Sequence, residues 1–353
     1  MRNKTMEYFN DKRLSPAERR RSAELPPHER QKLIKTLLVR YPRYKEVAKF
    51  VAKFHAPVDG GTPDYGNIGA LLGATRSGKS WVLKDYGVSF PSVPGDGAVT
   101  RPVVTVEIRN DMAAHDVVSQ FFKALGYVSV PKIKTEAMID MIIDALPHHG
   151  VELIVFDDVD NALRSNRSGY ATKILGFIKG ILDAGCCNVL CAGRPSLYET
   201  LAAAEQIKGR GGLQKKVLEP YRWQIDAERD QIRLLLDEID DRLPFADKTG
   251  FAEPDLAAHF YAVSGGLIGQ VMNYVRPAAY VAMNERADRV ERKHLIEAAK
   301  QLMPVGATFV PFQDDIDPNR LAEDAAEKKE RAREDEAIDR SKNPFGKSRR
   351  KRT

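Results

Sequence analysis

The chain has few cysteines and no long apolar run. Its three cysteines, Cys186, Cys187 and Cys191, lie close together, and no His or Cys cluster elsewhere completes a metal site. This pattern favours free thiols in a reducing compartment over a zinc site or a disulfide framework. The longest apolar runs, such as Leu153 to Phe156, fall far short of the roughly 20 residues that span a bilayer. We therefore expect a cytoplasmic protein with no membrane partner.

Acidic residues do not dominate either, because the net charge of the 353 residues is +6. This value permits a polyanionic partner without requiring one. Residues 1–29 are basic and poor in apolar side chains, which predicts a flexible arm. Residues 306–353 are dense in charge and end in "KNPFGKSRRKRT", which predicts a largely disordered tail. In that tail Phe345 is either a docking anchor for a partner or a bystander in an electrostatic arm.

Between these ends, the apolar pattern predicts three structured parts. Helical spacing from residue 30 to 57 indicates a helical lead-in. From 58 to 225, short apolar strands alternate with helical patterns, which is typical of a parallel sheet with helices on both faces. The expected strands are 68–72, 103–108, 153–156 and 189–192. Residues 226–305 lack strand signals and read as a small helical domain.

The stretch "GATRSGKS", residues 73–80, matches the phosphate-loop pattern G-x-x-x-x-G-K-[ST]. It follows an expected strand and precedes a helical pattern, which is the context that the motif requires. Its glycines let backbone N–H groups turn toward a phosphate, while Lys79 neutralises phosphate oxygens and Ser80 offers a hydroxyl to Mg²⁺. The residues expected to hold ATP are Gly73, Ala74, Thr75, Arg76, Ser77, Gly78, Lys79, Ser80 and Trp81.

A second carboxylate site follows the apolar strand in "ELIVFDDVDNAL", residues 152–163. Asp157 is expected to hold Mg²⁺ together with Ser80, and Asp158 to orient or deprotonate the attacking water. The alternative is that this acidic pair only caps the next loop. With a phosphate loop upstream, the pair favours ATP hydrolysis.

The order of these motifs resembles the AAA+ ATPases of transposition, the TniB and TnsC family. The resemblance rests on the phosphate loop, "VFDDVDNAL", a strand ending in "LCAG", then "EPYRW" and "SGGLIG". It implies a P-loop AAA+ sheet followed by a small helical lid domain. It also implies a homo-oligomeric ring or helical filament on double-stranded DNA, with ATP at the subunit interfaces. The implied partners are a transposase and a target-site selection protein, in a bacterial, nucleoid-associated setting.

Several positions depart from the family pattern. Asp157-Asp158 stands where the family usually has Asp-Glu, which points to slow, regulatory hydrolysis. Arg194 replaces a Thr at a strand end and is a further catalytic candidate. The residue that reaches a neighbour's γ-phosphate has no clean counterpart, since Arg210, Lys215 and Lys216 all qualify. Arg210 is favoured because a planar guanidinium holds two phosphate oxygens at once.

DNA contacts are expected from basic residues in segments that follow strands, where ligand-binding loops of α/β sheets project. The candidates are Arg109, Lys132, Lys134, Arg164 and Arg167. Contact through backbone phosphates with little base reading is expected for a target selector that tolerates many sequences.

The function predicted from sequence is thus an ATP-dependent, DNA-binding transposition regulator that recruits or activates a transposase. Two alternatives stay open: an origin-recognition or helicase-loader ATPase of the same fold, and a signalling P-loop NTPase that binds protein and not DNA.

Overall fold

The computed structural model divides the chain into two compact units. One holds residues 1–9 and 38–220, and the other holds residues 10–37 and 221–353. The structure describes residues 9–95, 98–110, 112–163, 169–205, 207, 212–303, 305–306 and 309–317. None of the helices in these ranges is both long enough and apolar enough to cross a membrane.

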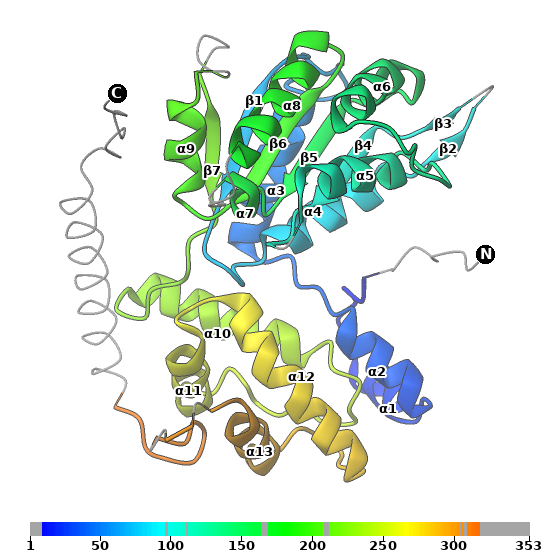
Figure 1. The fold of residues 1–353 in the computed structure, drawn as a ribbon. Helices are drawn as coiled ribbons and strands as arrows, with labels where there is room; N and C mark the ends of the chain where they lie inside the picture. The colour runs from blue at the N-terminus through cyan, green and yellow to red at the C-terminus, as the bar shows by residue number, and fades with distance from the viewer. Residues whose placement is uncertain are drawn as a thin grey trace, which may run out of the picture. The chain divides into compact units, whose positions relative to one another are not determined.

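The first unit is built on a five-stranded parallel sheet (Figure 1). Its order is β4 (Val103–Glu107), β5 (Leu153–Asp157), β6 (Asn188–Gly193), β1 (Ile68–Leu72) and β7 (Gln214–Val217). The four strands expected from apolar runs are confirmed within a residue or two at their ends. The edge strand β7 was not predicted, and neither was the short hairpin of β2 (Val93–Pro94) and β3 (Val99–Thr100).

Helices supply the two faces of this sheet. They are α3 (Pro42–His55), α4 (Lys79–Val88), α5 (Ala114–Ala124), α6 (Thr135–His148), α7 (Asp160–Leu163), α8 (Tyr170–Ala184) and α9 (Leu197–Ala203). The sheet is parallel and is covered by helices, so the expected α/β class is confirmed. Parallel strands are buried on both faces, which is why helices are needed on both sides.

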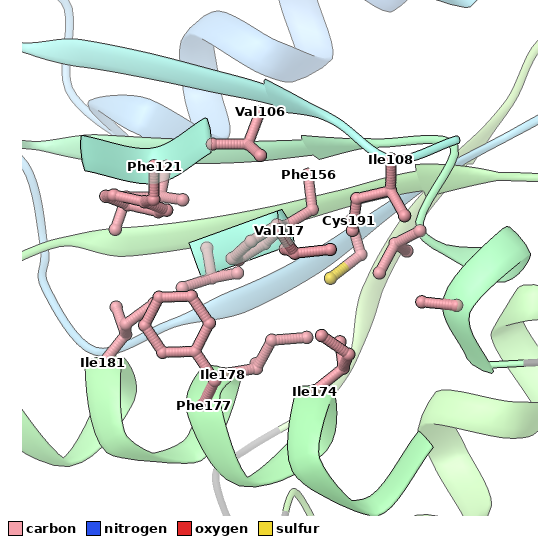
Figure 2. Packing of buried hydrophobic residues seen from close by; sticks show 14 of the residues in the cluster. Val106, Ile108, Val117, Phe121, Phe156, Ile174, Phe177, Ile178, Ile181 and Cys191 are labelled. Atoms are coloured by element: carbon pink, nitrogen blue, oxygen red, sulfur yellow. The ribbon is translucent and has the colours of Figure 1, made fainter. Parts of the chain in front are cut away.

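Alternate residues of the strands point into a hydrophobic core that lies between the sheet and the helices α5 and α8. Figure 2 shows Val106, Phe156 and Cys191 from three strands facing Phe121 of α5 and Phe177 of α8. The rings of Phe121, Phe156 and Phe177 pack against one another with centroids 5.5–6.1 Å apart. Burying such a side chain contributes about 2–3 kcal/mol. The core therefore holds the carboxyl ends of β5 and β6, where the candidate site lies.

The opposite face of the sheet meets α3. A Cβ added at Gly69 in β1 would lie 2.8 Å from the ring of Phe54, so the helix packs directly on the strand backbone there. Asn188 at the start of β6 donates its amide to the carbonyl oxygen of Phe54. The strand that leads into the phosphate loop is thus held between two layers.

The second unit is helical. It contains α1 (Pro16–Ala23), α2 (Pro27–Lys35), α10 (Asp226–Asp240), α11 (Pro254–Ser264), α12 (Ile268–Asn284) and α13 (Arg292–Leu302). The expected helical domain after residue 225 is present, and it also includes the N-terminal helices. The predicted helical lead-in, 30–57, therefore does not form one piece, because its first part belongs to this unit.

The flexible basic arm predicted over residues 1–29 is wrong for α1. Arg19 is 4% exposed and donates to the carbonyl oxygens of Asp240 and Asp247. Arg13 pairs with Asp241 at 2.7 Å. Carbonyl groups and carboxylates at the C-terminal end of α10 attract cations, so arginines that look solvated in the sequence fix this segment in place. Residues 1–8 lie outside the described residues.

The predicted disordered tail also begins later than residue 306. Phe312 is fully buried, packs on Phe260 and Tyr274, and donates its backbone N–H to His259. An apolar side chain with these partners fixes the segment around it. The "NPF" motif and Phe345 lie outside the described residues.

Gly266 of the "SGGLIG" motif allows a close backbone approach. Its φ is +77°, and an added Cβ would lie 2.2 Å from the carbonyl oxygen of Tyr221, whose N–H donates to Gly266. We expect Gly266→Ala to destabilise this unit by more than about 2 kcal/mol, since backbone strain and a clash add. Gly265→Ala is the matched control: φ is +57° but nothing lies within 4 Å. Urea unfolding of both variants tests this, and equal losses would contradict it.

Candidate nucleotide-binding site

The phosphate loop connects the end of β1 to the start of α4. Gly78 has a φ of +106°, which favours glycine, and precedes the first helical residue, Lys79. A Cβ at Gly73 would lie 2.8 Å from both the Leu218 carbonyl oxygen and the Ser77 hydroxyl oxygen. The two glycines of the motif are therefore required by the backbone itself, and the loop ends at a helix N-terminus suited to an anion.

Lys79 places its ammonium inside this loop. The side chain is 5% exposed, and Nζ donates to the carbonyl oxygens of Gly73 at 2.7 Å and Ala74 at 3.1 Å. Burial lowers the pKa of Lys79, while the carboxylates of Asp158 and Asp157 act in the opposite direction. A desolvated cation of this kind interacts strongly with an anion that enters the loop.

Asp157, at the end of β5, meets Ser80 of α4. Burial raises the pKa of Asp157 above its usual range, while the nearby Ser80 hydroxyl acts in the opposite direction. Its Oδ1 is buried with no hydrogen-bond partner, as is the hydroxyl oxygen of Ser77. An unpartnered buried oxygen is costly, and a cation beside it removes that cost.

This donor set fits Mg²⁺ better than a metal held by protein alone. No group of three or more His, Cys, Asp or Glu side chains within the described ranges is arranged to hold a metal ion. Mg²⁺ typically takes one or two oxygen ligands from the protein and others from substrate phosphates and water. Ser80 and Asp157 would supply such a pair, and Lys79 lies next to Ser80 at the start of α4.

Asp158 is held in an unusual backbone conformation. Its φ is +57°. On the N-terminal side the Asp157 carbonyl oxygen accepts from the Ile108 N–H, and on the C-terminal side Val159 donates to the Ala192 carbonyl oxygen of β6. Left-handed backbone at a residue other than glycine costs about 1 kcal/mol or more and is common at functional sites. Burial raises the pKa of Asp158, while the charges of Lys79 and Arg194 oppose the rise.

Arg194, directly after β6, pairs with a residue that sequence reasoning missed. Its Nε donates to Oδ2 of Asp160 at 2.5 Å, and the two side chains are 42% and 3% exposed. Asp160 is the third aspartate of "DDVDNAL", so its spacing after the strand was the available signal. The strand ends thus bring together Lys79, Asp157, Asp158 and the Asp160–Arg194 pair.

The other predicted nucleotide contacts follow from the loop itself. Thr75 and Arg76 are exposed at its tip, and Ala74 and Trp81 are half-buried. The ring of Trp81 packs against Phe9, with centroids 5.2 Å apart. The whole predicted set is therefore continuous around one loop.

Two of the three candidates for a trans-acting residue, Lys215 and Lys216, lie in β7. Arg210 lies outside the described residues. Lys215 in β7 lies 3.8 Å from the centroid of the Tyr198 ring, and Lys216 pairs with Glu46 at 2.8 Å. Both lysines therefore have a partner within their own chain.

The predicted DNA contacts are spread over two segments of the described chain. Arg109, which follows β4, is exposed, and so are Lys132 and Lys134 before α6. Glu136, near the start of α6, pairs with Lys173 near the start of α8 at 3.2 Å. Arg164 and Arg167 lie outside the described residues, so the structure places three of the five candidates, all of them exposed.

Comparison with solved structures identifies the fold. The chain is similar to the Aeropyrum pernix ORC1 protein in its complex with DNA, with 19% identity and a TM-score of 0.55 over 80% of this chain and 69% of that one. It is similar to the Aeropyrum pernix ORC2 protein in its ADPNP–ADP complexes, with 13% identity and a TM-score of 0.51 over 77% and 70%. It is also similar to Cdc6p from Pyrobaculum aerophilum, with 15% identity and a TM-score of 0.50 over 81% of this chain and 69% of that one. These likenesses show an AAA+ fold.

Comparison of sequences gives the family. No curated protein matches the chain significantly. The family model described as bacterial TniB protein matches residues 33–222, which is more than half of the chain and includes every element of the candidate site. The chain therefore belongs to the TniB family, as the order of its motifs predicted, and carries the AAA+ fold.

Proposed function

We propose that the protein is an ATP-dependent, DNA-binding regulator of transposition that assembles on double-stranded DNA and recruits or activates a transposase. The single observation that carries this proposal is the site at the strand ends, with Lys79 and Asp157 around one phosphate loop, in a chain of the TniB family. An unpartnered carboxylate oxygen and a buried ammonium side by side suit a nucleotide with its cation.

Different residues of the site bind the phosphates, hold Mg²⁺ and orient the attacking water. The loop N–H groups and Lys79 bind the phosphates, and Ser80 and Asp157 hold Mg²⁺, which when bound neutralises phosphate charge. Asp158, which follows Asp157 at the end of β5, orients the water that attacks the γ-phosphorus. Gly73 and Gly78 keep the loop tight enough for these contacts.

ATP acts as an assembly switch in this proposal. A ligand that binds only the assembled form stabilises it by mass action, and hydrolysis releases it. Arg210 of one subunit then contacts the γ-phosphate bound by its neighbour. Slow hydrolysis suits a regulator, because the assembly persists until a transposase and a target-site selection protein have engaged it.

DNA contact through phosphates follows from the exposed basic residues before α6. Replacing both Lys132 and Lys134 with Ala should weaken duplex binding and reduce the slope of log K against log salt by about 2, because each lost phosphate contact removes roughly 0.9. Fluorescence anisotropy with unrelated duplexes in the presence of an ATP analogue measures both quantities. Little preference among the duplexes is expected.

The control for this experiment removes the same charge elsewhere. Lys45 and Lys49 of α3 are also exposed, so the Lys45→Ala/Lys49→Ala variant loses two positive charges at another surface. Its salt slope should match that of the parent protein. Equal weakening in both variants would mean that only net charge matters, and binding to one duplex alone would contradict phosphate-led contact.

The second candidate function is an origin-recognition or helicase-loader ATPase, favoured by the likeness to ORC1, which was solved in complex with DNA. The two functions differ in what assembles. A transposition regulator assembles on DNA by itself, whereas a loader needs its helicase. A signalling NTPase, the third reading, would bind no duplex at low salt with ATP present.

A further inference from the structure

Asp160 is a buried carboxylate to which the proposed chemistry gives no role. It opens α7, three residues after Asp157, and its side chain is 3% exposed. Its partner is Arg194, which follows β6 and is 42% exposed. An ion pair with one desolvated member and one accessible member fixes the accessible side chain more firmly than a surface pair does.

The backbone around this pair leaves little room for another arrangement. Val159 donates its N–H to Ala192 of β6 at 3.0 Å, which binds the start of α7 to the end of that strand. A Cβ added at Gly193 would lie 2.6 Å from Oδ1 of Asp160 and 2.9 Å from a methyl carbon of Leu197. Glycine at this position is therefore what allows Asp160 to lie directly beneath Arg194.

The bond to Asp160 uses only Nε of Arg194. Within the described part of the chain, neither terminal guanidinium nitrogen of Arg194 has an acceptor of its own. A guanidinium matches two oxygens of one phosphate group. Gly73, the first residue of the phosphate loop, donates its N–H to the carbonyl oxygen of Gly193, the residue before Arg194, at 3.1 Å, so Arg194 follows directly on a backbone contact with the loop. A γ-phosphate carried by that loop is an acceptor of the required kind.

We propose that Asp160 is a positioning residue for ATP hydrolysis: by accepting the Nε–H of Arg194, it aims the terminal nitrogens of Arg194 at the γ-phosphate. This inference rests on the proposed function. The chain thereby supplies an arginine to the transferred phosphoryl group from its own strand end, in addition to any arginine from a neighbouring subunit.

The role of Arg194 in the reaction is electrostatic. The oxygen of water bonds to the γ-phosphorus as the bond from that phosphorus to the bridging oxygen breaks, one water proton passes to Asp158, and the products are ADP and phosphate. Charge on the γ-oxygens is stabilised by the guanidinium throughout. Because ADP lacks these oxygens, Arg194 should discriminate between ATP and ADP.

The test compares Asp160→Asn, Arg194→Ala, Arg194→Lys and the Asp160→Asn/Arg194→Ala double variant, with Asp144→Asn on the exposed side of α6 as the control. Turnover and the separate affinities for ATP and ADP are measured. We expect Arg194→Ala to lower kcat about 30-fold or more, Asp160→Asn about tenfold, and the double variant no further than Arg194→Ala. Affinity for ADP should change by less than about threefold.

Three results would overturn the inference. The first is an unchanged kcat in Asp160→Asn. The second is a double variant whose kcat loss equals the product of the two single losses. The third is an equal loss of ATP and ADP affinity together with a lowered Tm in the single variants, which is what a purely structural ion pair would give. Arg194→Lys should stay close to Arg194→Ala, because lysine keeps the charge but loses the fork. If the parent protein binds and hydrolyses ATP, any of these results removes the role of Asp160 and leaves the proposed function intact.

If Asp160→Asn does not fold, the unmodified protein decides the matter by NMR. The Nε–H resonance of Arg194, assigned by its loss in Arg194→Lys, should be protected from exchange with solvent, and the terminal N–H resonances should shift with an ATP analogue and not with ADP. Exchange of Nε–H at the rate of a solvated arginine would contradict the positioning contact.

Discussion

Lys79→Ala should lower the affinity for ATP by at least about 100-fold. The ammonium sits in a loop from which water is largely excluded, so its loss leaves the β- and γ-phosphate charge unbalanced where screening is weak. Assembly on DNA should be lost with it. Isothermal titration with an ATP analogue in the presence of Mg²⁺ measures the affinity directly.

Lys84→Ala controls for loss of a lysine from the same helix. Lys84 lies in α4 but is exposed, so its removal should leave ATP affinity within about twofold of the parent value. Parental ATP affinity in Lys79→Ala would exclude the phosphate loop as the nucleotide site. Equal losses in both variants would point to damage to the helix.

Asp158→Asn should spare ATP binding and lower the hydrolysis rate by about 100-fold, the usual scale for a general base. Asparagine keeps the shape of the side chain and tolerates positive φ, so the backbone at this position should be retained. ATP-bound assemblies on DNA should then last longer. Single-turnover hydrolysis and the lifetime of assemblies on surface-bound duplex give the two values.

Asp140→Asn, on an exposed turn of α6, is the matched control for this change. It should hydrolyse ATP at the parental rate. A parental rate in Asp158→Asn as well would make Asp158 a residue that merely shapes the turn after β5, and the water would then need another base.

The sheet and the phosphate loop were predictable because their signals are local. Three strands, β1, β5 and β6, are fully buried and mostly apolar, and β4 is a valine-rich run interrupted by the exposed Thr105. The spacing of Gly73, Gly78 and Lys79 after a strand predicts a phosphate loop. The fifth strand, β7, was missed because "QKKV" is short and largely exposed, with no apolar pattern. Its place in the sheet comes from pairing with β1, which sequence periodicity does not record.

The packing of the N-terminal helices and the Asp160–Arg194 pair could not be predicted from the sequence. Arg19 looks like part of a solvated basic arm, yet it is buried because acceptors more than 200 residues away meet it. Arg194 was noticed as a departure from a family pattern, but its partner could be found only once Gly193 and α7 were placed. Charged residues that are buried through distant partners carry no periodic signal.

The most direct test of the central claim, ATP-gated assembly on DNA, is negative-stain imaging of the full chain under four conditions. These are protein alone, with a non-hydrolysable ATP analogue, with duplex DNA, and with both. Ordered rings or filaments only when both are present are the predicted result. Ordered assemblies without nucleotide, or their absence with both ligands, would contradict the account.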